Sequence, residues 1–336
     1  MTELHVLIIE EDFPRKEEPI AGKTSLEWIE SSLGDLPFTV TREIAKPLPD
    51  ARYIAAVPRS LALMEREYLL SCVKELEKRS ISVAELGRGK IARREAFFEE
   101  PKIAFHSVCL TDLAESGNRE KAETLLSERI ARRLQEEGVI LEDPSLVKIS
   151  ANCVVEKGAR IEAFVKLERS IVRSGAVIRS FSTLVGSEVA EGAEVIESRV
   201  YDSVIGKGAK VGPFAYIRMG SAIGEKCRIG DFVEVKASFV ADGAKAAHLT
   251  YIGDAEIGVK TNIGCGAVFA NYDGKNKHKT KVGNEAFIGA NVNLIAPVTV
   301  GDGAFIAAAT TVTKNVSDGA FVIGRSRAEE KERKKK

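Results

Sequence analysis

Residues 204–235 read VIGKGAKVGPFAYIRMGSAIGEKCRIGDFVEV, and an aliphatic side chain returns at every sixth position of this stretch. The repeating positions are Ile205, Val211, Ile217, Ile223, Ile229 and Val235. An α-helix does not fit this period, because six residues turn a helix through about 600° and would spread the apolar positions around its surface. A parallel β-helix fits, since each hexad supplies one short strand and one corner, and three hexads close a triangular coil.

The same period continues on both sides of this stretch. The further runs are Ile149, Val155, Ile161 and Leu167, then Ile171, Val177, Thr183, Val189 and Val195, and finally Val282, Ile288, Leu294, Val300, Ile306 and Val312. A β-sandwich with chance spacing is the rival, but unrelated strands rarely keep one short period. We therefore predict a parallel β-helix of about nine coils between Ile149 and Val312, left-handed like the known hexapeptide β-helices.

Two interruptions break the period. The first spans 22 residues from Val235 to Ile257 and contains His248, and the second spans 13 residues from Phe269 to Val282 and contains NYDGKNKHKT. Insertions into a coiled repeat leave as surface loops, which often carry function. We expect both interruptions to be such loops.

His248 is the candidate general base. A single histidine is more often structural, but Arg218, Lys236 and Lys277 lie near His248 in sequence or in repeat register. Nearby positive charge favours a neutral imidazole, and basic side chains bind phosphate. This combination suits the deprotonation of an amine whose molecule also carries a phosphate.

Composition excludes several classes of function. The 336 residues include 49 Lys+Arg and 49 Asp+Glu, so no net field favours nucleic acid or acidic lipid. No apolar run approaches the roughly 18 residues of a membrane span, and the amino-terminal stretch is too acidic for a signal peptide. Five scattered cysteines without a C-x-x-C pair favour a reducing cytoplasm and give no support for a zinc site. We therefore expect a cytoplasmic protein without an integral membrane segment and without a nucleic-acid partner.

Several motifs together resemble one enzyme family. They are GPFAYIRMG (212–220), DFVEVK (231–236), AHLTYIGDAEIG (247–258), TNIGCGAVFANYDGKNKHKT (261–280), IAPVTVGDGAFIAAATTVTKNV (295–316) and IGRSR (323–327). From about residue 110 onward the chain resembles the acetyltransferase half of the bifunctional N-acetylglucosamine-1-phosphate uridyltransferase / glucosamine-1-phosphate N-acetyltransferase family. The resemblance implies a homotrimer that transfers acetyl from acetyl-CoA to glucosamine 1-phosphate without a metal. The product would serve UDP-N-acetylglucosamine and hence cell-wall peptidoglycan biosynthesis.

The resemblance also implies a role for each matching residue. His248 corresponds to the general base, Arg218 and Lys236 to the phosphate-binding pair, and Tyr251, Asn262 and Lys277 to further sugar-phosphate contacts. The acetyl-CoA side corresponds to Asn271, Tyr272, Cys265, Ala290, Ala308, Lys314 and Arg325.

Four positions depart from the family pattern. Ala247 and Ala309 stand where the family has glycine, Cys265 stands where it has alanine, and Ala290 stands where it has serine or cysteine. Loss of one neutral hydrogen bond costs about 0.5–1.5 kcal/mol, which weakens affinity more than it affects the chemistry.

The amino-terminal part departs further. The uridyltransferase half should open with a strand and a glycine-rich phosphate loop, but LHVLII (4–9) is followed by EEDFPR (10–15), which has no glycine. We predict a reduced, inactive nucleotidyltransferase-like α/β domain at 1–116, a connecting helix and turn at 117–144, a β-helix acetyltransferase domain at 145–324 and a charged tail at 325–336. Uridyltransferase activity is then not expected, and a separate uridyltransferase would perform that step.

Two other functions remain open. The four departures leave room for an acetyltransferase that acts on a different amino sugar phosphate. The reduced amino-terminal domain also leaves room for a non-catalytic scaffold or regulatory paralogue of an intact enzyme.

Overall fold

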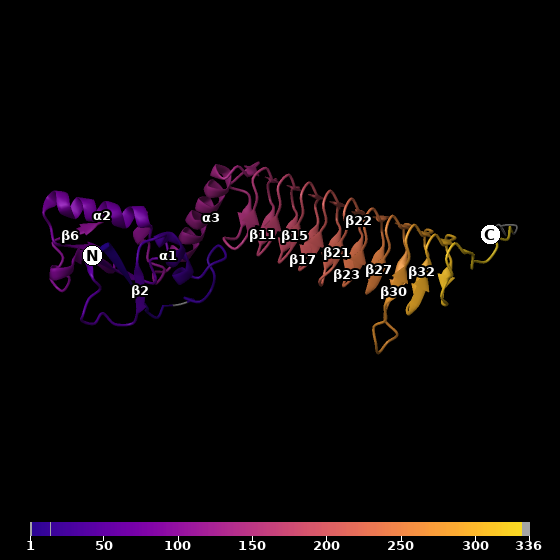
Figure 1. The fold of residues 1–336 in the computed structure, drawn as a ribbon, viewed down its shortest axis with the longest axis horizontal. Helices are drawn as coiled ribbons and strands as arrows, with labels where there is room; N and C mark the ends of the chain where they lie inside the picture. Colours follow the sequence, from indigo (N-terminus) through magenta and orange to yellow (C-terminus); the bar gives the residue numbers. More distant parts are fainter. Residues whose placement is uncertain (1, 14, 331–336) are drawn as a thin grey trace, which may run out of the picture. The chain divides into compact units, whose positions relative to one another are not determined.

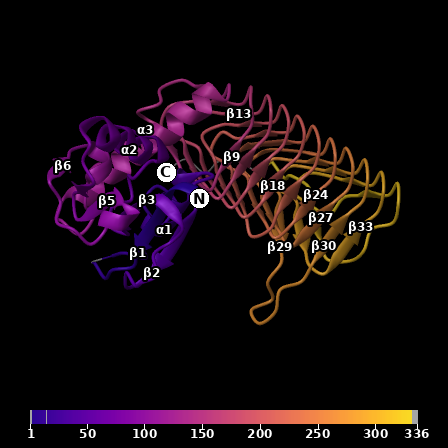
Figure 2. The same ribbon diagram turned by 60° about the vertical axis from the view of Figure 1, so that its left-hand side comes forward.

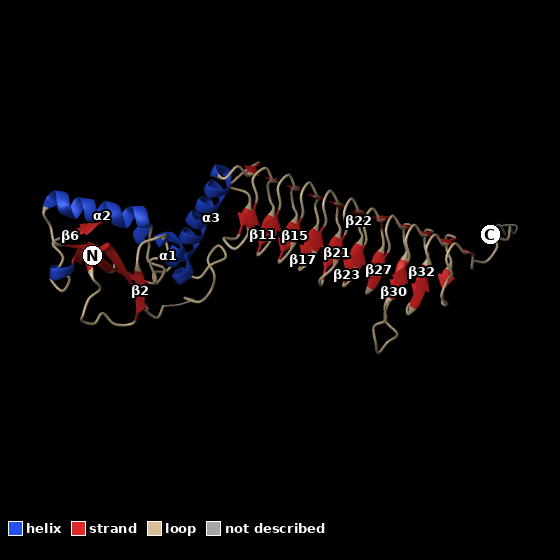
Figure 3. Ribbon diagram, viewed as in Figure 1, coloured by secondary structure: helices blue, strands red, loops and turns tan. Residues whose placement is uncertain are grey.

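The computed structural model describes residues 2–13 and 15–330, which fall into two compact units, Met1–Ile130 and Ala131–Lys336 (Figure 1). Residues 331–336 of the expected charged tail lie outside the described residues. The first unit holds α-helices and a mixed sheet, and the second consists mainly of short parallel strands (Figure 3).

The first unit is built on a six-stranded sheet in the order β2-β1-β3-β5-β4-β6. Its strands are β1 (Thr2–Ile9), β2 (Phe38–Thr41), β3 (Ala51–Pro58), β4 (Val83–Leu86), β5 (Gly89–Arg93) and β6 (Ile103–Phe105). Its helices are α1 (Ser25–Leu33) and α2 (Arg66–Arg79), with single 3₁₀ turns η1 (Arg94–Ala96) and η2 (Val108–Leu110). Strand β1 pairs in parallel with β2 and β3, whereas β5 runs antiparallel to β3 and β4.

Alternation along β1 explains how this sheet is covered. Leu4, Val6 and Ile8 are buried against α1 and α2 in one apolar cluster, while Leu7 packs with Phe97 in a second cluster. Successive strand residues point to opposite faces, so β1 contributes to both cores. The predicted α/β architecture of this part of the chain is confirmed.

Helix α3 (Asn118–Glu136) is the helix expected ahead of the coils. It buries Ala122, Leu126, Ile130 and Leu134 at helical spacing. Gly138 ends it at φ +89°, and its N–H donates to the Gln135 carbonyl over 3.0 Å. The boundary between the two units falls inside this helix.

The second unit is a triangular prism with three parallel sheets, named here by one residue of each. The His248 face contains β7 (Ile140–Leu141), β10 (Arg160–Ile161), β13 (Val177–Ile178), β16 (Glu194–Val195), β19 (Lys210–Val211), β22 (Arg228–Asp231), β25 (Lys245–His248), β28 (Asn262–Ile263), β31 (Phe287–Ile288), β34 (Phe305–Ile306) and β36 (Phe321–Val322). The Lys236 face contains β8 (Lys148–Ile149), β11 (Lys166–Glu168), β14 (Thr183–Val185), β17 (Arg199–Tyr201), β20 (Tyr216–Arg218), β23 (Glu234–Lys236), β26 (Tyr251–Gly253), β29 (Val268–Ala270), β32 (Asn293–Ile295) and β35 (Thr311–Val312). The Glu256 face contains β9 (Val154–Val155), β12 (Ile171–Val172), β15 (Glu188–Val189), β18 (Val204–Ile205), β21 (Ala222–Ile223), β24 (Phe239–Val240), β27 (Ala255–Ile257), β30 (Thr280–Val282) and β33 (Val298–Val300).

The three corners of the prism are also named by residues. The chain passes from the His248 face to the Lys236 face at the Leu249 corner, then to the Glu256 face at the Asp254 corner, and back at the Asp242 corner. The predicted left-handed parallel β-helix is confirmed. The Lys236 face has ten described strands from β8 to β35. Nine complete coils therefore lie between the first and the last of them, as expected.

The predicted inward positions are confirmed for three of the four runs. Between Ile171 and Val195, however, the first three positions were predicted wrongly by one residue, because Val172, Ile178 and Leu184 are fully buried instead. Each predicted residue is followed directly by the one that is buried, and the two sets, Ile171, Val177 and Thr183 or Val172, Ile178 and Leu184, both repeat every six residues. The sequence period therefore did not distinguish them. Leu184 is followed by Val189 after only five residues, which moves the register.

The first predicted interruption is also wrong. Between Val235 and Ile257 the coil continues, with Val240, Ala246 and Ile252 buried in its core. Two of the steps between buried positions are five residues long and not six, and Ala237 and Asp254 make these tight turns at positive φ. His248 consequently lies on a strand of the frame and not on an inserted loop.

The second interruption is confirmed as a loop. Residues 271–279 leave the prism between β29 and β30 and project beyond the coils as the hairpin-like excursion in Figure 2. Asp273 organises this loop by accepting N–H groups of Lys275 and Asn276 at 2.8 and 2.7 Å.

Candidate active site

His248 ends β25 and pairs with a carboxylate that the sequence pattern did not single out. Asp231 ends β22 in the preceding coil and is the register partner of His248. Their Nδ1 and Oδ1 atoms lie 2.5 Å apart, and the two side chains are 53% and 37% exposed. The hydrogen bond with His248 holds the pKa of Asp231 below its ordinary value. Asp231 therefore fixes the imidazole with Nδ1 engaged and leaves Nε2 for chemistry.

Two of the predicted phosphate ligands end neighbouring strands of the Lys236 face. Arg218 and Lys236 are register partners at the ends of β20 and β23. Arg218 bonds Glu234 through Nε at 2.9 Å, and Lys236, only 5% exposed, lies 3.0 Å from Asp254. Burial lowers the pKa of Lys236, but Asp254 outweighs it and holds the value above that of a free lysine.

The loop brings a third cation to this pair. The ammonium group of Lys236 faces Lys277, and this contact lowers the pKa of Lys277. The loop also brings Asn271, whose amide donates to Asp254 and, over 3.3 Å, to the hydroxyl of Tyr251. Three positive groups thus meet beside two paired carboxylates, which favours an added anion.

Further predicted residues form one row with His248. The register of β25, β28, β31 and β34 places Cys265, Ala290 and Ala308 at the position of His248 in the following coils. The Arg325 guanidinium donates to the Ala308 carbonyl over 3.0 Å. We call Asp231, His248, Cys265, Ala290 and Ala308 the His248 row.

Three predicted residues lie outside these groups. Asn262 begins β28 on the His248 face, between Lys245 and Phe287 in register. Tyr272 lies in the loop at the Asp254 corner, 60% exposed, and Lys314 follows β35 near the same corner. Tyr272 and Lys314 thus lie at a different corner from the His248 row, whereas Asn262 lies on the same face as that row.

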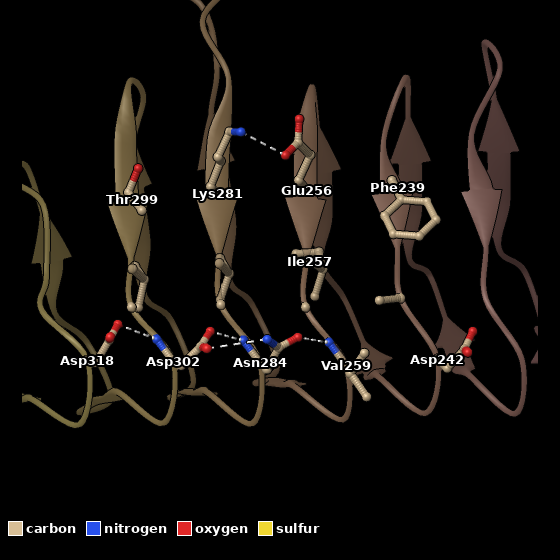
Figure 4. A pocket seen from close by; sticks show the side chains of 16 residues that line it. Phe239, Asp242, Glu256, Ile257, Val259, Lys281, Asn284, Thr299, Asp302 and Asp318 are labelled. Carbon is tan, nitrogen blue, oxygen red and sulfur yellow. Dashed lines mark hydrogen bonds and ion pairs between the residues drawn. The ribbon is translucent and has the colours of Figure 1, made fainter.

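A shallow pocket of about 670 Å³ lies elsewhere, on the Glu256 face and the Asp242 corner (Figure 4). None of the predicted site residues lines it. Its carboxylates and amide link successive coils, because Asp318, Asp302 and Asn284 accept the backbone N–H groups of Asp302, Asn284 and Val259, respectively, at 2.6–2.9 Å. The polar side chains that line this pocket therefore have a structural role, because they join successive coils by hydrogen bonds.

Among residues 2–13 and 15–330, no cluster of three His, Cys, Asp or Glu side chains is arranged to hold a metal ion. In the same ranges, no helix combines the length and apolar character needed to cross a membrane.

Comparisons with known proteins agree with the repeat. The bacterial transferase hexapeptide family (six repeats) matches residues 279–314. Among solved structures, a UDP-N-acetylglucosamine acyltransferase from Campylobacter jejuni is 20% identical, with 53% of this chain and 71% of that chain covered and a TM-score of 0.33. That score is too low for a comparison of details.

Sequence relatives are much closer. The bifunctional protein GlmU of Staphylococcus haemolyticus is 45% identical over 217 residues, which cover 63% of this chain and 47% of the relative. The bifunctional protein GlmU of an Exiguobacterium species is 46% identical over 213 residues, with coverage of 63% and 47%. The chain thus spans about half the length of the curated relatives it matches. Over some three fifths of its length, this chain is similar to the bifunctional protein GlmU.

Proposed function

We propose that this chain is a glucosamine-1-phosphate N-acetyltransferase that uses acetyl-CoA and contributes to UDP-N-acetylglucosamine biosynthesis in the cytoplasm. The observation that carries the proposal is a carboxylate-oriented histidine at the Leu249 corner together with a cluster of three cations at the Asp254 corner, at the two edges of the Lys236 face. Arg218, Lys236 and Lys277 would hold the phosphate, and His248 would face the amine of the same sugar.

The chemistry follows from the orientation of His248. The amine nitrogen attacks the thioester carbonyl, and Nε2 of His248 takes the proton that the amine loses. Asp231 accepts the Nδ1 hydrogen bond and stabilises the imidazolium that forms, as a carboxylate does in related base–orienter pairs. The proton transfer in this step uses His248 and Asp231 and does not require a metal ion.

The His248 row offers a path for the pantetheine arm. Adjacent strands lie about 4.8 Å apart, so three coils separate His248 from Ala308 by about 15 Å. The small side chains of Ala290 and Ala308 leave the row open, and the Arg325 guanidinium at its far end would meet the charged part of coenzyme A.

We further propose a homotrimer, since part of the site lies on another face of the prism. A second copy could bring Tyr272, Lys314 and the three cations of the Asp254 corner to the His248 row. The Leu249 corner supplies an apolar surface for such packing, formed by Phe164, Phe181, Phe214, Phe232 and Leu249, each more than half exposed. Exposed apolar ridges of this kind mark interaction surfaces.

Replacement of the base tests the proposal. His248→Ala should lower kcat for acetylation of glucosamine 1-phosphate about 100-fold or more, with the thermal midpoint unchanged because the side chain is exposed. Release of free coenzyme A measures the rate. Near wild-type turnover of the purified variant would contradict the base assignment.

Two departures in the His248 row favour one second candidate, an acetyltransferase for another amino sugar phosphate. Cys265 and Ala290 lie directly beyond the base and alter the shape of the cleft. A panel of amino sugar phosphates separates the two candidates, and glucosamine 1-phosphate as the poorest substrate would favour the second.

A further inference from the structure

Three chemically active side chains follow one another in successive coils of the His248 row. Asp231 and His248 are register partners, and the pairing of Ala246 with Ile263 sets Cys265 opposite His248 in the next coil. The register holds through this point, because the N–H of Gly266 donates to the carbonyl of Leu249 over 3.1 Å. Adjacent strands are about 4.8 Å apart, so the thiol and the imidazole are neighbours along the row.

Cys265 differs from the other cysteines of the chain. Cys72, Cys109, Cys153 and Cys227 are buried, whereas Cys265 is exposed, and all five are free thiols. Burial raises the pKa of each of the four buried thiols, to about 11 for Cys72. A buried thiol with a raised pKa is a poor nucleophile, so Cys265 is the chemically available thiol.

The order of the row resembles a nucleophile–base–orienter array. Asp231 engages Nδ1 of His248 on one side, and Cys265 lies on the other side. A histidine oriented by a carboxylate is the group that removes a proton from an adjacent thiol in covalent acyl transfer. Coenzyme A laid along Ala308 and Ala290 would bring its sulfur to Cys265 before it reached His248.

We propose that Cys265 accepts the acetyl group from acetyl-CoA as a thioester and then passes it to the amine. This inference rests on the proposed function for its donor. His248 takes the Cys265 proton, Sγ attacks the thioester carbonyl, the bond to the coenzyme A sulfur breaks, and the departing thiolate takes the proton from His248. The amine then attacks the Cys265 thioester, the nitrogen–carbon bond forms as the carbon–Sγ bond breaks, and the amine proton passes through His248 to the departing Sγ. One thioester replaces another, so no oxidant or further reactant is needed.

Mass spectrometry of the full-length protein tests the first half of this sequence. Incubation with acetyl-CoA alone, followed by an acid quench, should add one acetyl group that peptide mapping assigns to Cys265. Cys265→Ala should lose this adduct, and His248→Ala should form it about 100-fold more slowly. The four buried cysteines serve as internal controls and should stay unmodified.

Kinetics test the second half. The wild type should release coenzyme A in a burst without acceptor and give parallel double-reciprocal plots, while Cys265→Ala should lose the burst. A wild type that turns over without any Cys265 adduct overturns this inference and leaves the proposed function standing. Equal labelling of Cys265 in His248→Ala also overturns it. A Cys265 adduct that no amino sugar phosphate discharges overturns the proposed function and the second half of the sequence, and leaves only the acceptor role of Cys265.

Discussion

The positive charge of Lys277 is repelled by the neighbouring ammonium group of Lys236. Contact with the Lys236 ammonium group lowers the pKa of Lys277, so its protonated form is disfavoured in the folded chain relative to the unfolded chain. The penalty is fully present below the folded pKa and disappears as the pH rises to the ordinary lysine value of about 10.4. Asp254 pairs with Lys236, so a bound phosphate would supply the further negative charge that Lys277 needs.

Lys277→Ala should therefore separate binding from stability. At pH 7 the thermal midpoint should hold or rise, because the repulsion is gone, while KM for the sugar phosphate should rise about tenfold with kcat nearly unchanged. The stability difference from wild type should shrink as the pH approaches 10. Lys279→Ala is the matched control, since Lys279 lies 3.9 Å from Glu256 and contributes to another face. An equal rise in KM in both variants would contradict the phosphate role.

Asp231 can be tested as a positioning residue. In Asp231→Asn the amide oxygen can still accept from His248, but the negative charge that stabilises the imidazolium is lost. We expect kcat to fall at least tenfold with KM unchanged, and Asp231→Glu to recover part of the rate. A purely structural role predicts instead a loss of thermal stability with kcat unchanged, so the split between kcat, KM and melting temperature decides the matter.

The residues of the candidate site were only partly predictable from the sequence. His248 was identified because the resemblance and the nearby basic residues both pointed to it. Asp231 was missed, because its contact with His248 depends on a 17-residue coil that a strict six-residue period does not contain. Only stacking of the coils makes these two side chains neighbours.

The strands of the β-helix were easier to predict than single contacts, but the lengths of its corners were not predictable. The aliphatic period predicted the β-helix and its core, since any hexad repeat must bury the same position of each strand. Corner length was not predictable: Leu184 to Val189 and Val235 to Val240 are five-residue steps, in which one residue at positive φ makes the turn. The expected gap before Ile257 followed from this shortening and not from an insertion.

The 271–279 loop is a separate element whose order rests on Asp273. Its carboxylate accepts N–H groups of Lys275 and Asn276 and lies 2.7 Å from the His278 ring, and these contacts hold the pKa of Asp273 well below its ordinary range. Asp273→Ala should loosen the loop that carries Lys277. KM for the sugar phosphate should rise severalfold while the melting temperature stays the same, since the loop lies outside the stacked coils.

A matched control exists at another corner. Asp242 accepts the backbone N–H of Glu225 over 2.8 Å and so joins two coils, far from the loop in chain position. Asp242→Ala should lower the melting temperature and leave KM unchanged. The reverse pattern in the two variants would show that the loop supports the fold and not the site.

The chain joins this β-helix to an α/β unit in which no glycine-rich loop follows β1. The carboxylates of EEDFPR (10–15) are paired within the chain. Arg59, 4% exposed, bonds Glu10 at 2.9 Å and Glu17 at 3.0 Å, and Glu11 accepts the N–H of Ser60 and pairs with Arg88. The carboxyl ends of β1 and β3, where open α/β sheets bind ligands, are thus occupied by internal ion pairs.

Arg59→Met tests whether the two units work separately. Loss of the guanidinium leaves Glu10, 22% exposed, without its partner, and breaking a buried ion pair costs about 3 kcal/mol. Calorimetry of the full chain should show the first unit unfolding at lower temperature, with the β-helix transition unmoved. Acetyl transfer should keep its wild-type kcat and KM below the first transition, since every proposed catalytic group lies beyond residue 130. If the acetylation rate falls in step with the first transition, the amino-terminal unit supports the active site and the two units do not work separately.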